Sequence, residues 1–129
     1  QFMTDVDNCE FCNIISDTSN ATTLIETESY LCFLDKYPVT EGHSLVIPRD
    51  HIQYLEQADG AALYEFLETA IAEIRRKYDP DGINVGLNDG PAAGQTIPHL
   101  HWHIIPRYKS DVEDPTGGVR GVIPSKRTY

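Results

Sequence analysis

Three histidines, His99, His101 and His103, alternate with apolar residues in the segment HLHWHII. Side chains two residues apart on a β-strand lie on the same face. If residues 96–106 form a strand, the three imidazoles share one face and neighbouring rings are about 6–7 Å apart. The opposite face carries Trp102 and suits a core. Such a row could contact an extended phosphate chain, hold zinc in an open three-histidine site, or simply be a polar strand face.

A loop rich in glycine, alanine and proline precedes the histidines at residues 88–98. Small residues let the backbone approach a ligand closely, and successive backbone amides can hold phosphate oxygens. Asn88 and Gln95 add neutral hydrogen-bond donors. Each residue alone is equally well explained as part of a turn. Beside three histidines, the loop as a whole favours an anion-binding role.

A second group of chemically capable residues lies near the start of the chain. Cys9 and Cys12 have the two-residue spacing of a metal-binding knuckle, which needs two further ligands to close a tetrahedral site. The alternative is a reduced, metal-free pair in a flexible loop. Cys32 lies in an apolar run and is expected in the core. Three cysteines do not form a disulfide framework.

Local patterns predict the elements that must position these residues. Residues 1–22 are polar and predict a loop that holds the cysteine pair. Apolar residues recur at helical spacing within residues 59–78, where Asp59 can cap a long helix. The predicted strands are residues 23–26, 30–34, 44–47, 83–87 and 96–106. This order predicts an α+β fold with an antiparallel sheet.

The whole-chain composition limits the classes of partner. A length of 129 residues predicts one domain, residues 1–129, and 40% hydrophobic residues suffice for one core. The formal net charge of −10 argues against a nucleic-acid polymer or an anionic membrane as partner. We see no apolar run of membrane-spanning length and no secretion signal, so we expect a cytoplasmic protein.

The histidine segment resembles the signature of the histidine triad (HIT) family of nucleotide hydrolases and transferases. Residues 88–96 and the segment GHSLVIP at residues 42–48 are similar to that family too. The resemblance covers about residues 9–108, and residues 109–129 resemble the C-terminal extension of bacterial members. It implies a five-stranded antiparallel sheet with one long helix and a shorter one, and a homodimer.

The resemblance also implies catalytic roles. His101 would attack the α-phosphorus of a nucleotide and form a covalent nucleotidyl-histidine, which water then cleaves. Neutral imidazole is nucleophilic near pH 7 because its ordinary pKa is about 6.5. His103 and Gln95 would donate hydrogen bonds to the phosphate, and His43 would support the triad. The implied nucleotide contacts are Asp35, Asn88, Gly94, Gln95, Thr96 and His103.

Zinc-containing relatives imply a structural metal site in this chain. Carried over residue by residue, its ligands are Cys9, Cys12, His51 and His99. This would tie the start of the chain to the catalytic segment and orient the first triad histidine. Mg²⁺ would enter only as a counter-ion of a nucleotide substrate.

Two residues bear on the branch of the family. His103 stands where transferase branches carry glutamine, which favours a hydrolase. Thr96 resembles dinucleoside polyphosphate hydrolases, whereas phosphoramidases more often have serine there. The alternatives are an adenosine phosphoramidase with the same nucleophile and a nucleotide-binding regulatory protein with incidental turnover. Arg107 and Arg120 could approach a polyphosphate, or could be ordinary surface charges.

Overall fold

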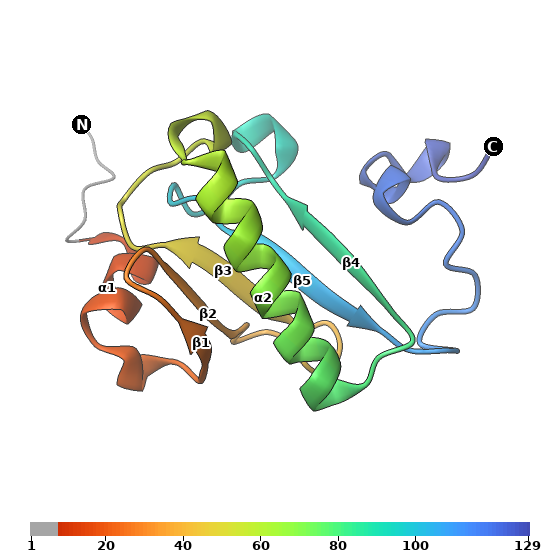
Figure 1. The fold of residues 1–129 in the computed structure, drawn as a ribbon. Helices are drawn as coiled ribbons and strands as arrows, with labels where there is room; N and C mark the ends of the chain where they lie inside the picture. Colours follow the sequence, from red (N-terminus) through yellow and green to blue (C-terminus); the bar gives the residue numbers. More distant parts are fainter. Residues whose placement is uncertain (1–7) are drawn as a thin grey trace.

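A five-stranded antiparallel sheet forms the centre of the computed structural model, which describes residues 8–129 (Figure 1). The strand order is β1-β2-β3-β5-β4. The strands are β1 (Thr23–Glu26), β2 (Tyr30–Leu34), β3 (Ser44–Pro48), β4 (Gly82–Leu87) and β5 (Trp102–Arg107). Two α-helices, α1 (Glu10–Ser16) and α2 (Gly60–Tyr78), accompany them. The predicted α+β class, with one long and one shorter helix, is confirmed.

The long helix α2 crosses one face of the sheet (Figure 1). The Asp59 carboxylate accepts a hydrogen bond from the Ala62 amide at 3.3 Å and caps the first turn. Asp79, in the left-handed conformation with φ 48°, ends the helix. Its buried stripe from Leu63 to Ile74 packs on strand residues that include Cys32, which is fully buried as predicted.

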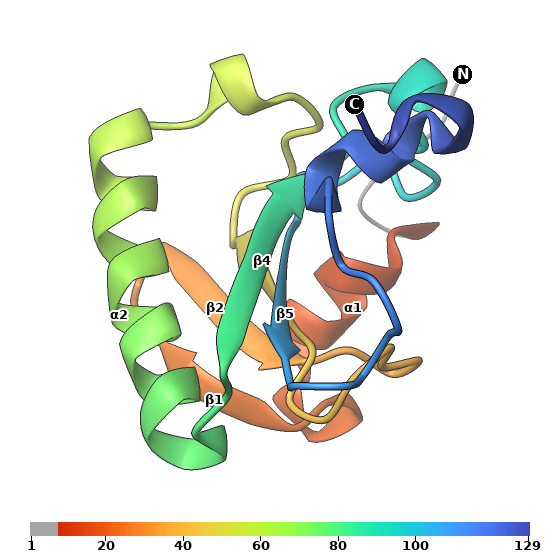
Figure 2. The same cartoon turned by 90° about the vertical axis from the view of Figure 1, so that its right-hand side faces the viewer.

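The short helix α1 lies on the opposite face of the sheet, as the turned view shows (Figure 2). Phe11 and Ile14 are three positions apart, so they share one side of α1 and are both buried. They pack against buried side chains of β2 and β3, including Phe33. The sheet therefore has an apolar layer on each face, and the catalytic candidates lie on the α1 side.

Two local predictions are wrong. The loop predicted over residues 1–22 contains α1 in its described part, because Cys9 caps the helix and its apolar side finds a core; residues 1–7 lie outside the described residues. The strand predicted over 96–106 begins only at Trp102 and reaches Arg107. Before it, the Leu100 amide donates to the Ile52 carbonyl at 2.6 Å, away from the strand ladder.

The C-terminal segment folds back beside β4 as two short 3₁₀ turns, Gly118–Val122 and Pro124–Lys126. The Arg127 guanidinium holds it together by donating to the carbonyls of Asp114 and Thr116. Within residues 8–129, no helix is both long enough and apolar enough to cross a bilayer.

Candidate active site and metal centre

His101 is buried, and one contact fixes which of its nitrogens carries the proton. Its Nδ1 lies 2.9 Å from the main-chain oxygen of His99. A carbonyl oxygen can only accept, so Nδ1 must donate. In the neutral ring, Nε2 therefore keeps its lone pair. The side chain expected to be the nucleophile thus has one nitrogen locked as donor and the other available for bond formation.

A chain of three side chains fixes the protonation of His103 in the same way. The Val39 amide donates to His43 Nδ1 at 3.1 Å, so the proton of neutral His43 is on Nε2. This Nε2 lies 3.0 Å from His103 Nδ1 and 3.4 Å from an Asp35 carboxylate oxygen. It therefore donates to His103 Nδ1, which must accept. The remaining proton of neutral His103 is on its Nε2.

Burial keeps these two rings neutral near pH 7. It lowers the pKa of His43, and the Asp35 carboxylate opposes that shift only in part. Burial also lowers the pKa of His103, and the neighbouring His101 and His43 rings lower it further. Neutral rings are what the two tautomers require, so the pKa directions agree with the hydrogen bonds.

His101 and His103 form a nucleophile–donor pair. Their ring centroids are 5.4 Å apart, with planes inclined at 64°. One ring offers an Nε2 lone pair and its neighbour offers an Nε2–H. A phosphate group between them could be attacked at phosphorus while one of its oxygens accepts a hydrogen bond. The arrangement is thus suited to displacement at phosphorus.

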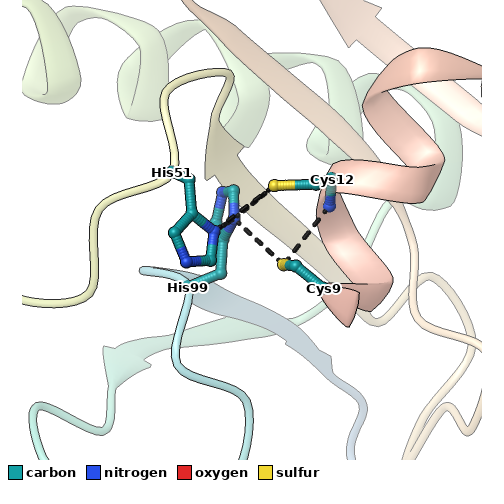
Figure 3. A group of neighbouring side chains, drawn as sticks. All are labelled: Cys9, Cys12, His51 and His99. Atoms are coloured by element: carbon teal, nitrogen blue, oxygen red, sulfur yellow. Dashed lines mark hydrogen bonds between the residues drawn. The ribbon is translucent and has the colours of Figure 1, made fainter. Parts of the chain in front are cut away.

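The two cysteines meet His51 and His99 beside this pair (Figure 3). His99 Nδ1 lies 3.4 Å from Cys9 Sγ, 3.6 Å from Cys12 Sγ and 3.1 Å from His51 Nδ1. Cys12 Sγ lies 3.3 Å from His51 Nδ1. Tetrahedral zinc would separate two nitrogens by about 3.3 Å and a nitrogen from a sulfur by about 3.5 Å. The four donor atoms therefore already have the spacing of a tetrahedral metal site.

The protonation of these four side chains also suits a metal ion. His99 Nε2 donates to the Pro48 carbonyl at 2.9 Å, which leaves the Nδ1 lone pair facing the cluster. Burial lowers the pKa of His99 to about 4, so the ring stays neutral. Burial and the adjacent Cys9 raise the pKa of Cys12 to about 12 without a cation. A divalent cation would reverse this effect, because a coordinated thiol loses its proton.

Asp35, His43 and His103 form a second group with ligand atoms close together. A metal on His43 Nε2 would require the proton to move to Nδ1, where the Val39 amide already donates. This group is therefore better described as a hydrogen-bond chain than as a metal site. It also contains a single carboxylate, which does not favour Mg²⁺.

The loop before the histidines is held together by Gln95. The Gln95 side-chain oxygen accepts from the Gly90 amide at 2.9 Å, and its nitrogen donates to the carbonyls of Gln53 and Ile97 at 3.3 and 3.1 Å. Both amide hydrogens are therefore used within the protein. In this structure Gln95 fixes the loop, whereas the sequence suggested a direct phosphate donor.

The other predicted contacts differ in position. Gly94 has φ 98°, and an added Cβ would lie 3.5 Å from the Asn88 amide nitrogen, so Asn88 and Gly94 adjoin each other. Thr96 is exposed and lines a cavity of about 210 Å³ beside Cys9 and His51. It is thus on the metal side of the loop.

The two arginines considered as phosphate ligands are already engaged elsewhere. Arg107 binds the Asp111 carboxylate at 2.8 Å and Asn84 Oδ1 at 2.7 Å. Arg120 lies 4.5 Å from the centroid of the Tyr129 ring in the C-terminal segment.

Sequence reasoning missed several groups that define the site. The main-chain groups of Val39 and Pro48 fix two tautomers, and no side-chain pattern indicates them. Phe11 was also missed. Its ring packs against His101 with centroids 5.0 Å apart. Its place between the two cysteines was the one available signal.

Fold and site together define a small α+β protein built around a row of histidines beside a Cys/His cluster. Residues 16–110 match the family model described as HIT domain. The chain belongs to the HIT family. The protein named Protein hit from Bacillus subtilis is 42% identical over 105 residues, which cover 79% of this chain and 72% of that protein.

Two relatives have names that state an activity. An adenylylsulfatase of Arabidopsis thaliana is 39% identical over 107 residues, covering 81% of this chain and 54% of that protein. An adenosine 5′-monophosphoramidase of Schizosaccharomyces pombe is 33% identical over 100 residues, covering 78% of this chain and 74% of that protein.

Solved structures of the family agree with the fold. A HIT family protein from Bacillus anthracis has a TM-score of 0.75 at 37% identity, covering 81% of this chain and 77% of that one. A Zn-bound histidine triad family protein from Mycobacterium smegmatis has a TM-score of 0.72 at 34% identity, covering 85% and 82%.

Proposed function

We propose that this HIT protein hydrolyses a nucleotide conjugate at its α-phosphate through a covalent nucleotidyl-His101 intermediate. The observation that carries the proposal is the locked His101 ring, whose Nδ1 donates to the His99 carbonyl and whose Nε2 keeps its lone pair. A ring so fixed needs no proton removed before it attacks. The names of the two enzymatic relatives support hydrolysis of an adenylyl conjugate.

The first step forms a bond between His101 Nε2 and the α-phosphorus. The bond to the leaving group breaks and its electron pair departs with that group. His103 donates its Nε2–H to a phosphate oxygen, on which negative charge develops. The positive charge gained by His101 is stabilised where Nδ1–H meets the His99 carbonyl.

The second step returns the enzyme to its starting state. A water oxygen attacks the same phosphorus, the N–P bond breaks, and its electron pair returns to His101 Nε2. The proton lost by the water passes to solvent, and the nucleoside monophosphate is released. Two displacements replace one difficult displacement, which is the advantage of covalent catalysis.

The leaving group favours a phosphate or sulfate over an amine. Phosphate and sulfate depart as stable anions and need no proton from the enzyme. Neutral His103, with Nδ1 already accepting from His43, is suited to hydrogen bonding and poorly suited to full proton transfer. We therefore place dinucleoside polyphosphates and adenylyl sulfates first. An adenosine phosphoramidate is the second candidate, supported by the relative from S. pombe.

We further propose that Cys9, Cys12, His51 and His99 hold a structural zinc ion, supported by the spacing of their donor atoms and by the Zn-bound relative. Zinc would cross-link α1 to the catalytic segment when bound. Its effect on catalysis would be indirect, because the carbonyl of His99 is the group that accepts the His101 proton.

A substrate panel with product identification tests the proposed function. Diadenosine tri- and tetraphosphate, adenylyl sulfate and an adenosine phosphoramidate are compared with wild type, His101→Asn and His103→Ala. We expect turnover in wild type, none in His101→Asn with nucleotide binding retained, and a kcat lowered about 10²–10³-fold in His103→Ala. Near-normal kcat in His101→Asn would overturn the mechanism, and no turnover above background would favour a binding protein.

A further inference from the structure

Phe11 has no part in the proposed chemistry, yet it contacts two triad histidines. Its ring centroid lies 5.0 Å from that of His101 and 5.8 Å from that of His99, with planes inclined at 66° and 90°. The side chain is 2% exposed. In sequence it lies between Cys9 and Cys12 on α1. One buried ring thus joins the metal cluster to the expected nucleophile.

The His101 ring needs a second constraint besides its hydrogen bond. The bond from Nδ1 to the His99 carbonyl fixes one point of the ring, while the torsion that turns an imidazole is intrinsically broad. Turning the ring would exchange the places of Nδ1 and Nε2, and the reactive lone pair would then face the carbonyl. A tilted aromatic ring packed against the imidazole resists this rotation.

We propose that Phe11 is a positioning residue that keeps His101 in its reactive orientation and Nδ1-protonated tautomer. The metal cluster fixes the start of α1, α1 fixes Phe11, and the Phe11 ring restrains His101. A second connection from the same cluster runs through the main chain of His99. The inference rests on the proposed function only in treating His101 as the nucleophile.

The chain offers a matched control in Phe33. Phe33 belongs to the same apolar layer, is 3% exposed, and packs its ring against Phe11 at 5.9 Å. Among the ring contacts of residues 8–129, that one is its only contact. Phe11→Met and Phe33→Met make the same chemical change at similar burial. Only the first removes a ring from His101.

The experiment measures the His101 tautomer by ¹⁵N NMR of the imidazole nitrogens at about pH 8, where imidazoles are neutral. We expect the Nδ1–H form in wild type and in Phe33→Met, and a mixture of tautomers in Phe11→Met. We also expect kcat to fall about tenfold or more in Phe11→Met, with KM changed less than about threefold. An unchanged tautomer in Phe11→Met, or an equal change in Phe33→Met, would overturn the inference.

Removing the metal from the folded protein provides a second arm that needs no core variant. Chelation should shift the His101 tautomer in wild type and add little in Phe11→Met, because the restraint is already lost there. An equal shift in both proteins would contradict a connection through Phe11. The tautomer is read without turnover, so a failure of the proposed hydrolase function would appear separately, as activity that survives His101→Asn.

Discussion

Replacing His43 tests whether the hydrogen-bond chain controls His103. Asparagine can still accept from the Val39 amide near the place of Nδ1, but it is too short to donate to His103 Nδ1 as Nε2 does now. Glutamine reaches further and can supply that donor. We therefore expect His43→Asn to release the His103 tautomer and His43→Gln to preserve it in large part.

The size of the effect follows from burial. His43 is 3% exposed, so His103 Nδ1 would lose its partner in a place poorly reached by water. Leaving a buried acceptor without a partner costs about 1–3 kcal/mol. If this cost falls on the transition state, kcat decreases about 5- to 150-fold. His43→Gln should retain most of the wild-type kcat.

A double-mutant cycle completes the assay. Steady-state kcat is measured for His43→Asn, His103→Ala and the double variant, and urea unfolding shows that each is folded. Because His43 acts through His103, the double variant should have the kcat of His103→Ala. Multiplicative losses would show that His43 acts independently. A kcat in His43→Gln as low as in His43→Asn would refute the role of the donor.

Two further predictions concern the metal and pH. Cys12→Ser should lower bound zinc from about one per chain to near zero and decrease the thermal unfolding temperature, measured by metal analysis and calorimetry. The free energy of unfolding should be fully present above about pH 6.5 and decrease as the pH falls below it. The reason is that burial lowers the pKa of His43 and His103, so the unfolded chain binds protons that the folded chain does not. Urea unfolding at pH values on both sides measures this.

Each of these predictions has its own control. Cys32→Ala removes a fully buried thiol outside the cluster and should decrease stability while leaving zinc content unchanged. Zinc retained by Cys12→Ser would argue against the four-ligand site. Replacing His103 by alanine should flatten the dependence of stability on pH. A protein that becomes more stable as the pH falls through this range would contradict the pKa directions.

The elements that the sequence predicted well are those with strong local signals. The helix over residues 59–78 has a regular apolar stripe and a capping aspartate, and the structure has both. The hairpin of residues 23–26 and 30–34 was also confirmed as β1 and β2. In each case, the local preference and the tertiary packing favour the same conformation.

Helix α1 could not be predicted in this way. Seven residues are too few to form a stable helix alone. Its stability comes from tertiary contacts such as Phe11 with Phe33, which a local pattern does not reveal. The start of β5 was misplaced for a related reason. The Leu100 amide has a partner in Ile52, 48 positions away, and this contact takes it out of the sheet.

At the site, the resemblance to the family identified the side chains, but not their hydrogen-bond partners. His99, His51 and the two cysteines were expected together and are together. The tautomers depend on main-chain groups of Val39, Pro48 and His99 itself. Since every residue carries the same main-chain groups, only the fold decides which ones face an imidazole.

Direct detection of the covalent intermediate tests the central claim. Wild-type protein is mixed with substrate, quenched within the first turnover, kept alkaline to preserve the N–P bond, and digested for mass spectrometry. We predict a nucleoside monophosphate adduct on His101 in wild type and its loss in His101→Asn. Product formed in the first turnover without an adduct on His101, or with an adduct on another residue, would contradict the mechanism.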